Sequence, residues 1–357
     1  MVRTKPFPSD EIEMKEEIIL NTYDEDTDYI DDGVEGFDLD KVCNNIKIDI
    51  VNESEDKMTL EFDLVHVNAP IANSLRRVLI AEVPTMAIEK IYLYQNTSVI
   101  QDEVLCHRIG LLPLKVDPRP FKFPLTKVIG VNESGVDCDE EPEGDIERNL
   151  IFNFNVTCTR NRNAQPTATD PSQLYHNSSV YSKSFIWQPI GDQKETYEGN
   201  EPAMVHDEIL VAKLRPGQEI EASCHCVKGI GRDHAKFSPV ATASYRLLPT
   251  IRLQSEITGA NARKLQGCFS EGVIELVKKG GKEFAKVKDA RRDTCSRNVL
   301  RYPELAKDVE LGKKKAHFIF SVESTGALEA KELVVEACLV MELKCRSLKA
   351  QLEALLQ

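Results

Sequence analysis

The chain has 357 residues, of which 41% are hydrophobic, and a formal net charge of −13 at pH 7. Residues 1–40 hold 14 acidic and 3 basic side chains, so the rest of the chain is nearly neutral and lacks the basic excess of an independent nucleic-acid-binding protein. The length allows two domains, and no run of about 18 apolar residues predicts a membrane-spanning helix.

Ten cysteines are spread along the chain, and no secretory signal precedes them. This combination predicts a reducing, intracellular compartment and free, mostly buried thiols.

Residues 1–40 are predicted to form a largely disordered acidic tail. A short helix near residues 11–20 is the one element that this tail could hold. Ordered structure is expected to begin with alternating apolar and polar residues at 45–50. A polar turn at 52–56 and a second alternation at 59–64 follow, so this region predicts a β-hairpin.

A short helix is predicted after Asn68, which suits an N-cap, and before Pro84, which ends it. Its apolar face, expected to pack inside the domain, consists of Ile71, Leu75, Val78 and Leu79. The other face carries Asn73, Arg76 and Arg77. From residue chemistry alone these three form either a solvated polar face or a contact surface. A second strand and helix should follow, up to about residue 114.

The pattern of polar and apolar residues changes between residues 115 and 240. An acidic stretch at 137–145 and a polar stretch at 161–179 read as loops. Between them Phe152, Phe154 and Val156 alternate with polar residues, which predicts a half-buried strand. The region therefore reads as a β-rich unit with long loops.

After Tyr245 regular patterns return, with a strand predicted at 317–322. Ser324 or Thr325 can cap a helix that runs from about Leu328 toward the end of the chain. Its apolar stripe repeats at steps of three and four and comprises Val334, Ala337, Met341, Cys345, Leu348, Leu352 and Leu355. The stripe either packs on its own domain or is shared with a partner chain.

Patterns typical of a metal or cofactor site are weak. In a strand, Cys224 and Cys226 point one way and His225 the other, whereas structural zinc needs two ligand pairs. Acidic residues between 24 and 35 match the spacing of a calcium loop, but Tyr29 stands where that loop needs glycine. Gly229-Ile230-Gly231 lacks the third glycine of a dinucleotide motif. No catalytic residue, cofactor or metal is therefore predicted.

One basic stretch spans residues 278–292, and Lys313-Lys314-Lys315 forms another. Such runs are usually solvated. The alternative is docking to an acidic surface of a neighbouring protein. Such docking is favoured over DNA binding, because few aromatic residues lie between the basic ones. The sequence does not decide whether 278–292 contacts protein or nucleic acid.

Three segments carry a resemblance to a known family. The first runs from Asn73-Ser74-Leu75-Arg76-Arg77-Val78 through Val83-Pro84-Thr85 and Asp102-Glu103 to His107-Arg108-Ile109-Gly110-Leu111-Leu112-Pro113. It resembles the alpha motif of the larger alpha-like subunits of cellular RNA polymerases. The second, Cys226–Pro239, resembles a segment that these subunits share. Its continuation, Val240–Pro249, looks like the branch common to polymerases I and III, and the polymerase II branch usually has Trp where Phe237 stands. The third comprises Arg297-Asn298-Val299 and the segment Phe318–Gly326. Together the resemblance covers residues 41–345.

The resemblance implies an α+β fold in which an inserted β-rich domain interrupts a discontinuous alpha-like dimerisation domain. The expected parts are the acidic tail (1–40), the dimerisation domain (41–87 and 241–357, ending in a long amphipathic helix) and the inserted domain (88–240). Some relatives carry a zinc or iron–sulfur site in the inserted domain, for which this chain shows no equivalent cysteine cluster.

The implied role is that of a non-catalytic assembly subunit of nuclear RNA polymerases I and III, in the nucleolus and nucleoplasm, for transcription of the ribosomal RNA precursor, 5S rRNA and tRNA. It would pair with a smaller alpha-like subunit as a platform for the two large catalytic subunits and other assembly-platform subunits, without sequence-specific nucleic-acid or membrane binding. The residues expected in dimerisation or packing are Ile71, Leu75, Val78, Leu79, Met341, Cys345, Leu348 and Leu352. The candidates for contacts with the large subunits are Asn73, Arg76, Arg77, His234 and Lys236.

Two rival interpretations remain from the sequence. One is the polymerase II counterpart, against which stand Phe237, the missing cysteine cluster and the segment Ser244–Pro249. The other is a stand-alone enzyme that uses the region from Cys224 to His234. The sequence does not identify the contacts on partner subunits, the role of the acidic tail or how two polymerases share the chain.

Overall fold

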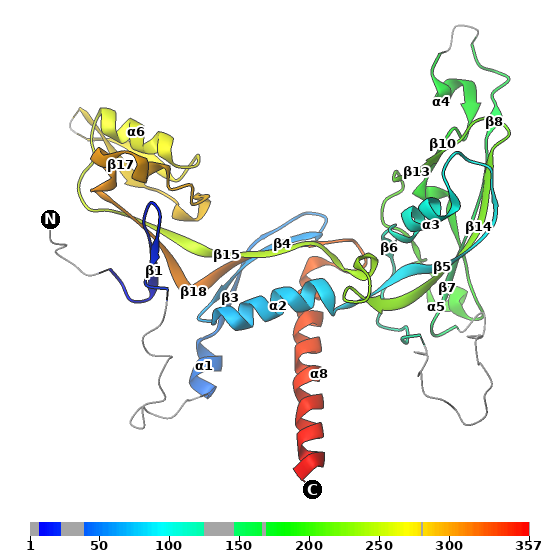
Figure 1. Cartoon of the computed structure of the whole chain (residues 1–357), viewed down its shortest axis with the longest axis horizontal. Coiled ribbons are helices and arrows are strands. Elements are labelled where there is room, and N and C mark those ends of the chain that lie inside the picture. Colours follow the sequence, from blue (N-terminus) through cyan, green and yellow to red (C-terminus); the bar gives the residue numbers. More distant parts are fainter. Residues whose placement is uncertain (1–6, 23–38, 125–145, 166–168, 280, 357) are drawn as a thin grey trace. The chain divides into compact units, whose positions relative to one another are not determined.

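Figure 1 shows a computed structural model of the chain, which describes residues 7–22, 39–124, 146–165, 169–279 and 281–356. These residues form helices and sheets in two compact units, so the predicted α+β class is confirmed. Unit 1 comprises residues 1–52, 61–74 and 244–321, and unit 2 comprises residues 53–60, 75–243 and 322–357. Each unit therefore collects segments that are far apart in the sequence.

Most of the largest sheet belongs to unit 1. Its strand order is β2-β1-β18-β4-β3, and β15 also pairs with β18. The predicted hairpin is confirmed, because β3 and β4 are neighbours. The strands are β1 (Glu11–Met14), β2 (Ile19–Leu20), β3 (Lys47–Glu53), β4 (Thr59–Val65), β15 (Val240–Leu253) and β18 (Val309–Ser324).

Strand β4 shows why this sequence forms a half-buried sheet. Leu60, Phe62 and Leu64 are buried, while Glu61 and Asp63 lie on the opposite face, as the period of two in a strand requires. The ring of Phe62 stacks on that of Phe320 with 5.1 Å between centroids. The strand predicted at 317–322 is thus the end of a longer strand, β18.

The start of the described chain corrects the prediction for the acidic tail. Residues 11–14 form β1, not a helix, and pair antiparallel with β18. The Glu11 carboxylate binds Arg252 at 2.5 Å and accepts a hydrogen bond from Thr250 at 2.7 Å, and Met14 is buried in the core of unit 1. Disorder was therefore the wrong prediction here, because the acidic residues have specific partners. Most of the rest of the tail, residues 1–6 and 23–38, lies outside the described residues, as does the calcium-like spacing.

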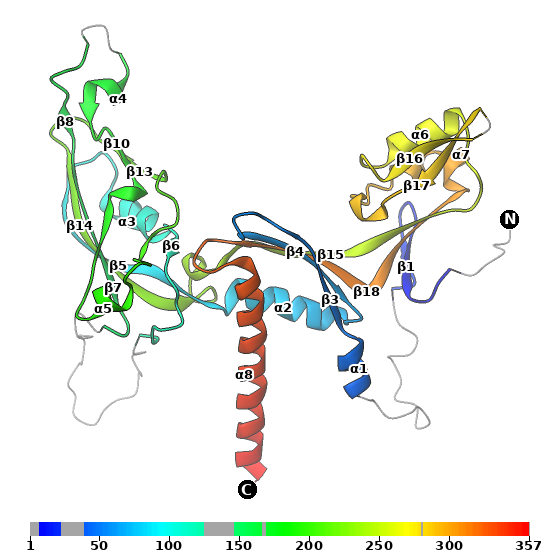
Figure 2. The same ribbon diagram turned by 180° about the vertical axis from the view of Figure 1, so that it is seen from behind.

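Helix α6, helix α7 and a hairpin share a core cluster with strands of this sheet. Helix α6 contacts the hairpin of β16 and β17, and Figure 2 shows α6, α7 and the hairpin together. The core contains Ile257, Ala262, Leu265, Val273 and Leu305. The elements are α1 (Leu39–Asn45), α6 (Ala260–Cys268), β16 (Ile274–Lys279), β17 (Lys282–Val287), η3 (Ala290–Arg292), η4 (Asn298–Arg301) and α7 (Pro303–Ala306).

Unit 2 is built on a four-stranded sheet with the order β11-β7-β14-β5. The predicted strand around Phe154 is confirmed as β7, in which Phe152, Phe154 and Val156 are buried. Leu105 and Ile109 of α3 join them in one core cluster. The elements are β5 (Pro84–Asn96), α3 (Asp102–Gly110), β7 (Leu150–Thr157), β11 (Phe185–Gln188) and β14 (Glu219–Ile230).

Short elements complete the β-rich part of unit 2. Part of the stretch predicted as a loop at 161–179 forms α4 and β9, while residues 125–145 and 166–168 are outside the described residues. The short elements are β6 (Leu114–Lys115), β8 (Thr159–Arg160), α4 (Pro171–Leu174), β9 (Tyr175–His176), β10 (Ser179–Tyr181), η1 (Ser182–Ser184), α5 (Gln193–Thr196), β12 (Ala203–Met204), β13 (Leu210–Lys213) and η2 (Ala235–Phe237).

Two helices carry the residues expected in dimerisation or packing and three of the contact candidates, whereas His234 and Lys236 lie outside them. Helix α2 spans Ala69–Ala81, as predicted, and its first turn is closed by the Asn68 carbonyl, which accepts hydrogen bonds from the backbone N–H groups of Ile71 and Ala72. Helix α8 spans Ala330–Leu356 and begins two residues after the predicted start. It extends as one continuous helix with the chain's C-terminus at its free end (Figure 1).

Candidate subunit interface

The apolar face of α2 is only partly covered within this chain. Leu75, Val78 and Leu79 are buried, with Leu79 fully so. Ile71, one turn before Leu75 on the same face, is 48% exposed. The buried residues fix the helix on its own chain, and the first turn offers an uncovered apolar side chain.

The polar residues of α2 differ in exposure. Asn73 and Arg76 are half-buried, and Arg77 is exposed. The guanidinium of Arg77 is therefore accessible to another chain, and its five donors suit carboxylates and carbonyl groups.

The segment that follows β14 closes tightly on the end of α2. A Cβ on Gly231 would lie 2.3 Å from the Ile80 carbonyl oxygen, so only glycine fits there. The backbone N–H of Arg232 donates to the Ala81 carbonyl at 2.8 Å. In the sequence, Gly231 counts against a dinucleotide motif and lies within the segment Cys226–Pro239 that carries part of the family resemblance. The structure gives this glycine a packing role, which no pattern within the local segment could indicate.

The next residues bind back to the start of β5. Phe237 is buried over Gly229, and its carbonyl accepts a hydrogen bond from the Thr85 hydroxyl at 2.6 Å. The Lys236 ammonium donates to the Ile88 carbonyl at 2.9 Å and pairs with Glu89. The candidate contact residue Lys236 is therefore engaged inside its own unit.

His234 lies at the start of this segment and is exposed. Its Nδ1 accepts a hydrogen bond from the Lys236 backbone N–H at 3.1 Å. This bond occupies Nδ1, so Nε2 is the ring nitrogen that remains to meet another chain.

The base of α8 is buried. Leu328, Ala330, Leu333 and Ala337 are buried. Just before the helix, Gly326 has a φ of +107°, and a Cβ there would lie 2.4 Å from the Val205 side chain. The chain therefore enters α8 through a turn that only glycine allows.

Beyond Ala337 the same helix is uncovered. Ala337 is the last buried residue of α8 among those that the structure describes. Met341 is half-buried, and Cys345, Leu348 and Leu352 are exposed, the two leucines by 59% and 60%. At about 100° per residue these four residues continue the buried face of the base of α8. An exposed apolar stripe of this length is typical of a surface for another helix.

Strand β3 has an exposed apolar surface that its sequence pattern does not predict. All seven of its residues are exposed, and it forms an edge of the six-stranded sheet. Ile48 is 61% and Ile50 54% exposed. Edge strands with exposed apolar residues are prone to pairing with another chain. The alternation showed a strand, but a half-buried strand and an uncovered edge strand have the same pattern.

Cys224 and Cys226, the cysteines beside His225, are buried in the core of unit 2. Burial raises the pKa of the Cys224 thiol to about 12 and that of Cys226 well above its usual range. His225 lies on the other face of the sheet, edge-on to Tyr92 at 4.9 Å. Across the described ranges, no three His, Cys, Asp or Glu side chains are grouped as metal ligands. Thiols held protonated by burial are poor nucleophiles.

The basic stretch is divided between structural and exposed residues. Arg291 binds Asp63 at 2.6 Å and Glu61 at 3.0 Å, so it holds η3 on β4. Arg263 shares Glu283 with Lys278, and the Lys278 side chain is 81% exposed.

No helix in the described part of the chain has the length and apolar content to cross a membrane.

A helix anchored at its base and apolar along its free part, with an apolar edge strand, defines a protein that assembles with another chain. The chain belongs to the RNA polymerase Rpb3/Rpb11 dimerisation domain family, whose model matches residues 61–345.

The relatives place it within this family. Over 320 residues it is 48% identical to the DNA-directed RNA polymerases I and III subunit RPAC1 of Mus musculus, covering 90% of this chain and 88% of the relative. It is 44% identical to the subunit of the same name from Saccharomyces cerevisiae, covering 88% and 89%. The DNA-directed RNA polymerase II subunit rpb3 of Dictyostelium discoideum is 31% identical, covering 82% and 90%.

Proposed function

We propose that this chain is the larger alpha-like subunit of RNA polymerases I and III, a non-catalytic platform that pairs with a smaller alpha-like chain. The greater identity to relatives named for polymerases I and III than to the polymerase II relative supports this assignment over the polymerase II rival. The stand-alone enzyme is disfavoured, because Cys224 and Cys226 are buried with raised pKa values.

The observation that carries the pairing proposal is the uncovered stripe of α8. Leu348 and Leu352 are long apolar side chains at helical spacing, and unit 2 covers neither of them. Burying two leucines would contribute about 3–6 kcal/mol to association. In unit 1, Ile71 of α2 and Ile48 of β3 are further exposed apolar side chains.

For the domain organisation we propose that residues 41–87 and 241–357 form the dimerisation domain and 88–240 the inserted β-rich domain. Residues 88–240 all lie within unit 2 and contain the four-stranded sheet apart from the first residues of β5.

Contacts with the large catalytic subunits are assigned to polar groups. Arg77 and His234 are exposed and are the best candidates, whereas Asn73 and Arg76 are half-buried. Lys236 has a supporting role, because it binds Glu89 and the Ile88 carbonyl. Assembly into these two polymerases would place the chain in the nucleus, with polymerase I in the nucleolus and polymerase III in the nucleoplasm.

The assignment is tested by purifying the tagged full-length chain from cells and quantifying co-purifying proteins by mass spectrometry. The expected result is the large subunits of both polymerases I and III together with one small alpha-like chain. Recovery of polymerase II large subunits instead would favour the rival assignment. Recovery of the chain without polymerase subunits would contradict both.

A further inference from the structure

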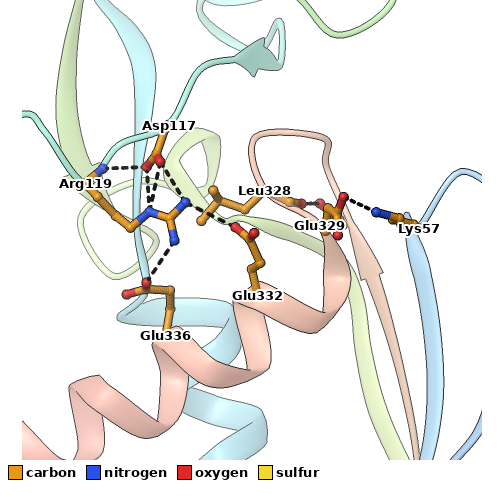
Figure 3. Close-up of polar contacts among 8 residues, drawn as sticks. Lys57, Asp117, Arg119, Leu328, Glu329, Glu332 and Glu336 are labelled. Carbon is orange, nitrogen blue, oxygen red and sulfur yellow. Dashed lines mark hydrogen bonds and ion pairs between the residues drawn. The ribbon is translucent and has the colours of Figure 1, made fainter. Parts of the chain in front are cut away.

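One arginine, Arg119, contacts two successive turns at the base of α8. The Arg119 guanidinium lies 2.7 Å from an oxygen of Asp117 and 3.2 Å from the Glu332 carboxylate, and it reaches Glu336 at 3.7 Å. Glu332 and Glu336 are one turn apart on α8, as Figure 3 shows. One cation therefore binds two successive turns of the helix.

The turn that carries Arg119 is rigid. Asp117 accepts hydrogen bonds from both the side chain and the backbone N–H of Arg119, at 2.9 Å each. Burial opposes ionisation of Asp117, but these bonds outweigh it and hold its pKa below the usual range. Prolines on either side, Pro118 and Pro120, restrict the backbone, and the following Phe121 is buried in the unit 2 core. Arg119 is thus held in place before it meets the helix.

We propose that Arg119 is a positioning residue that sets the direction of α8 for pairing with the small alpha-like chain. This inference rests on the proposed function. Arg119 does not touch the stripe, and it acts by fixing the two helical turns from which the stripe extends.

The geometry of a long helix explains why one exposed cluster matters for pairing. Leu352 lies 16 residues beyond Glu336, which corresponds to about 24 Å along the helix. A tilt of about 10° at the base would move that side chain by about 4 Å, a large fraction of the helical pitch of about 5.4 Å. A small change in direction therefore misplaces the stripe against a rigid partner.

The same cluster contributes little to folding. The Arg119, Glu332 and Asp117 side chains are 48%, 43% and 33% exposed, and ion pairs in such surroundings add little to stability. Glu332 also lies in the first turn of α8, where a carboxylate favours the helix without any partner. Loss of Arg119 should leave α8 folded and free its direction.

Other ion pairs on α8 do not replace this contact. Lys57 binds Glu329 at 2.9 Å from a 56% exposed position, and Lys344 binds Glu82 at 2.7 Å from a 55% exposed one. Each joins a flexible lysine to a single carboxylate. Arg119 has the planar, pre-oriented donors that a lysine lacks.

The test compares R119A with K122A in the full-length chain, measuring the dissociation constant for the small alpha-like chain and the melting temperature. Lys122 is the matched control, because it is an exposed cation on the same segment that pairs with Glu147 away from α8. D117N is a second variant, which removes the charge that holds Arg119. We expect R119A to weaken pairing about tenfold, D117N to weaken it less, and K122A to leave it unchanged, with all melting temperatures close to that of the parent.

A charge exchange separates position from simple loss of charge. R119E alone should weaken pairing more than R119A, and adding E332R should recover part of the affinity, because positions 119 and 332 then carry opposite charges again while Asp117 and Glu336 keep negative charge beside position 119. Normal pairing of R119A would overturn the proposal. So would a melting temperature that falls in step with affinity in both R119A and D117N. If L348E/L352E still pairs, the α8 stripe is not the pairing surface and the proposed function fails at that point. If L348E/L352E loses pairing but R119A pairs normally, only the role of Arg119 is contradicted.

Discussion

At the scale of single residues, two carboxyl groups of unit 1 have pKa values shifted in opposite directions. Burial works against ionisation of Asp63, but hydrogen bonds from Arg291 and His317 prevail and hold its pKa below the usual range. Burial raises the pKa of Asp293, whose Oδ1 has no hydrogen-bond partner among the described residues. Asp63 therefore stabilises the fold as an anion, and Asp293 is destabilising as one.

The two groups predict opposite effects of removing the charge. The lowered pKa of Asp63 gives stability that is present above about pH 4, the pKa of an unfolded aspartate, and is lost as the pH falls through the folded value. D63N should therefore be less stable than the parent at pH 7, by about 1–3 kcal/mol, with a smaller difference at pH 4.

The raised pKa of Asp293 gives stability that is present below about pH 4 and is lost as the pH rises through the folded value. D293N should therefore be more stable than the parent at pH 7 and similar to it at pH 4. Urea unfolding of both variants at the two pH values measures this. The same sign for both variants at pH 7 would contradict the account.

Glycines also show where residue-level prediction stops. The sequence contains Gly229 and Gly231 two positions apart, but Gly229 is required by the ring of Phe237, in the segment after β14, and Gly231 by the Ile80 carbonyl, which is distant in the chain. Only the folded arrangement shows which atom fills the space where a Cβ would be.

At the scale of elements, β1 makes a testable claim about the N-terminal segment. Met14 is buried, and the Glu11 carboxylate binds Arg252. A chain lacking residues 1–15 should lose about 2–4 kcal/mol of stability, from the buried Met14 and the lost strand contacts. The control is a chain lacking residues 1–6. Equal urea midpoints for the two shortened chains would show that β1 is dispensable.

The stripe of α8 offers a second test, because one of its residues is a thiol. Cys345 is exposed within the stripe, and Cys43 is exposed on α1. A maleimide should modify both in the free chain. Pairing with the small alpha-like chain should slow the modification of Cys345 at least tenfold, because the thiol is then covered.

Mass spectrometry of the modified peptides gives the two rates. Cys224 and Cys226 should stay unmodified throughout, since burial keeps their thiols protonated. If Cys345 reacts equally fast in the pair, the stripe is not the pairing surface.

Apolar periodicity in the sequence was sufficient to locate β4, β7, α2 and α8. It could not divide α8 into a buried base and an uncovered extension, because Ala337 and Leu348 occupy the same repeating pattern. It also missed β1, because strand formation there depends on Arg252 and on β18. Long-range partners, rather than local propensity, decided these cases.

At the scale of the whole molecule, the sequence indicated the α+β class, and its motifs indicated the family. The discontinuous course of the chain could be expected only from the resemblance. Unit 1 joins residues 1–52 to 244–321, and no local pattern links segments so far apart. Of the candidate contact residues, the sequence could not show that Lys236 is used inside its own chain, since Glu89 is distant in sequence.

The proposed pairing depends most on α8 as the surface that joins this chain to its small partner. The most direct measurement is the dissociation constant of the pair formed by L348E/L352E, with folding followed by circular dichroism. The matched control is S347E/A350E, which adds the same charge to the opposite side of the helix. The account predicts at least a hundredfold weaker pairing for L348E/L352E, because unpaired charges would be buried, with near-normal pairing of the control and unchanged helix content in both. Normal pairing of L348E/L352E would contradict it.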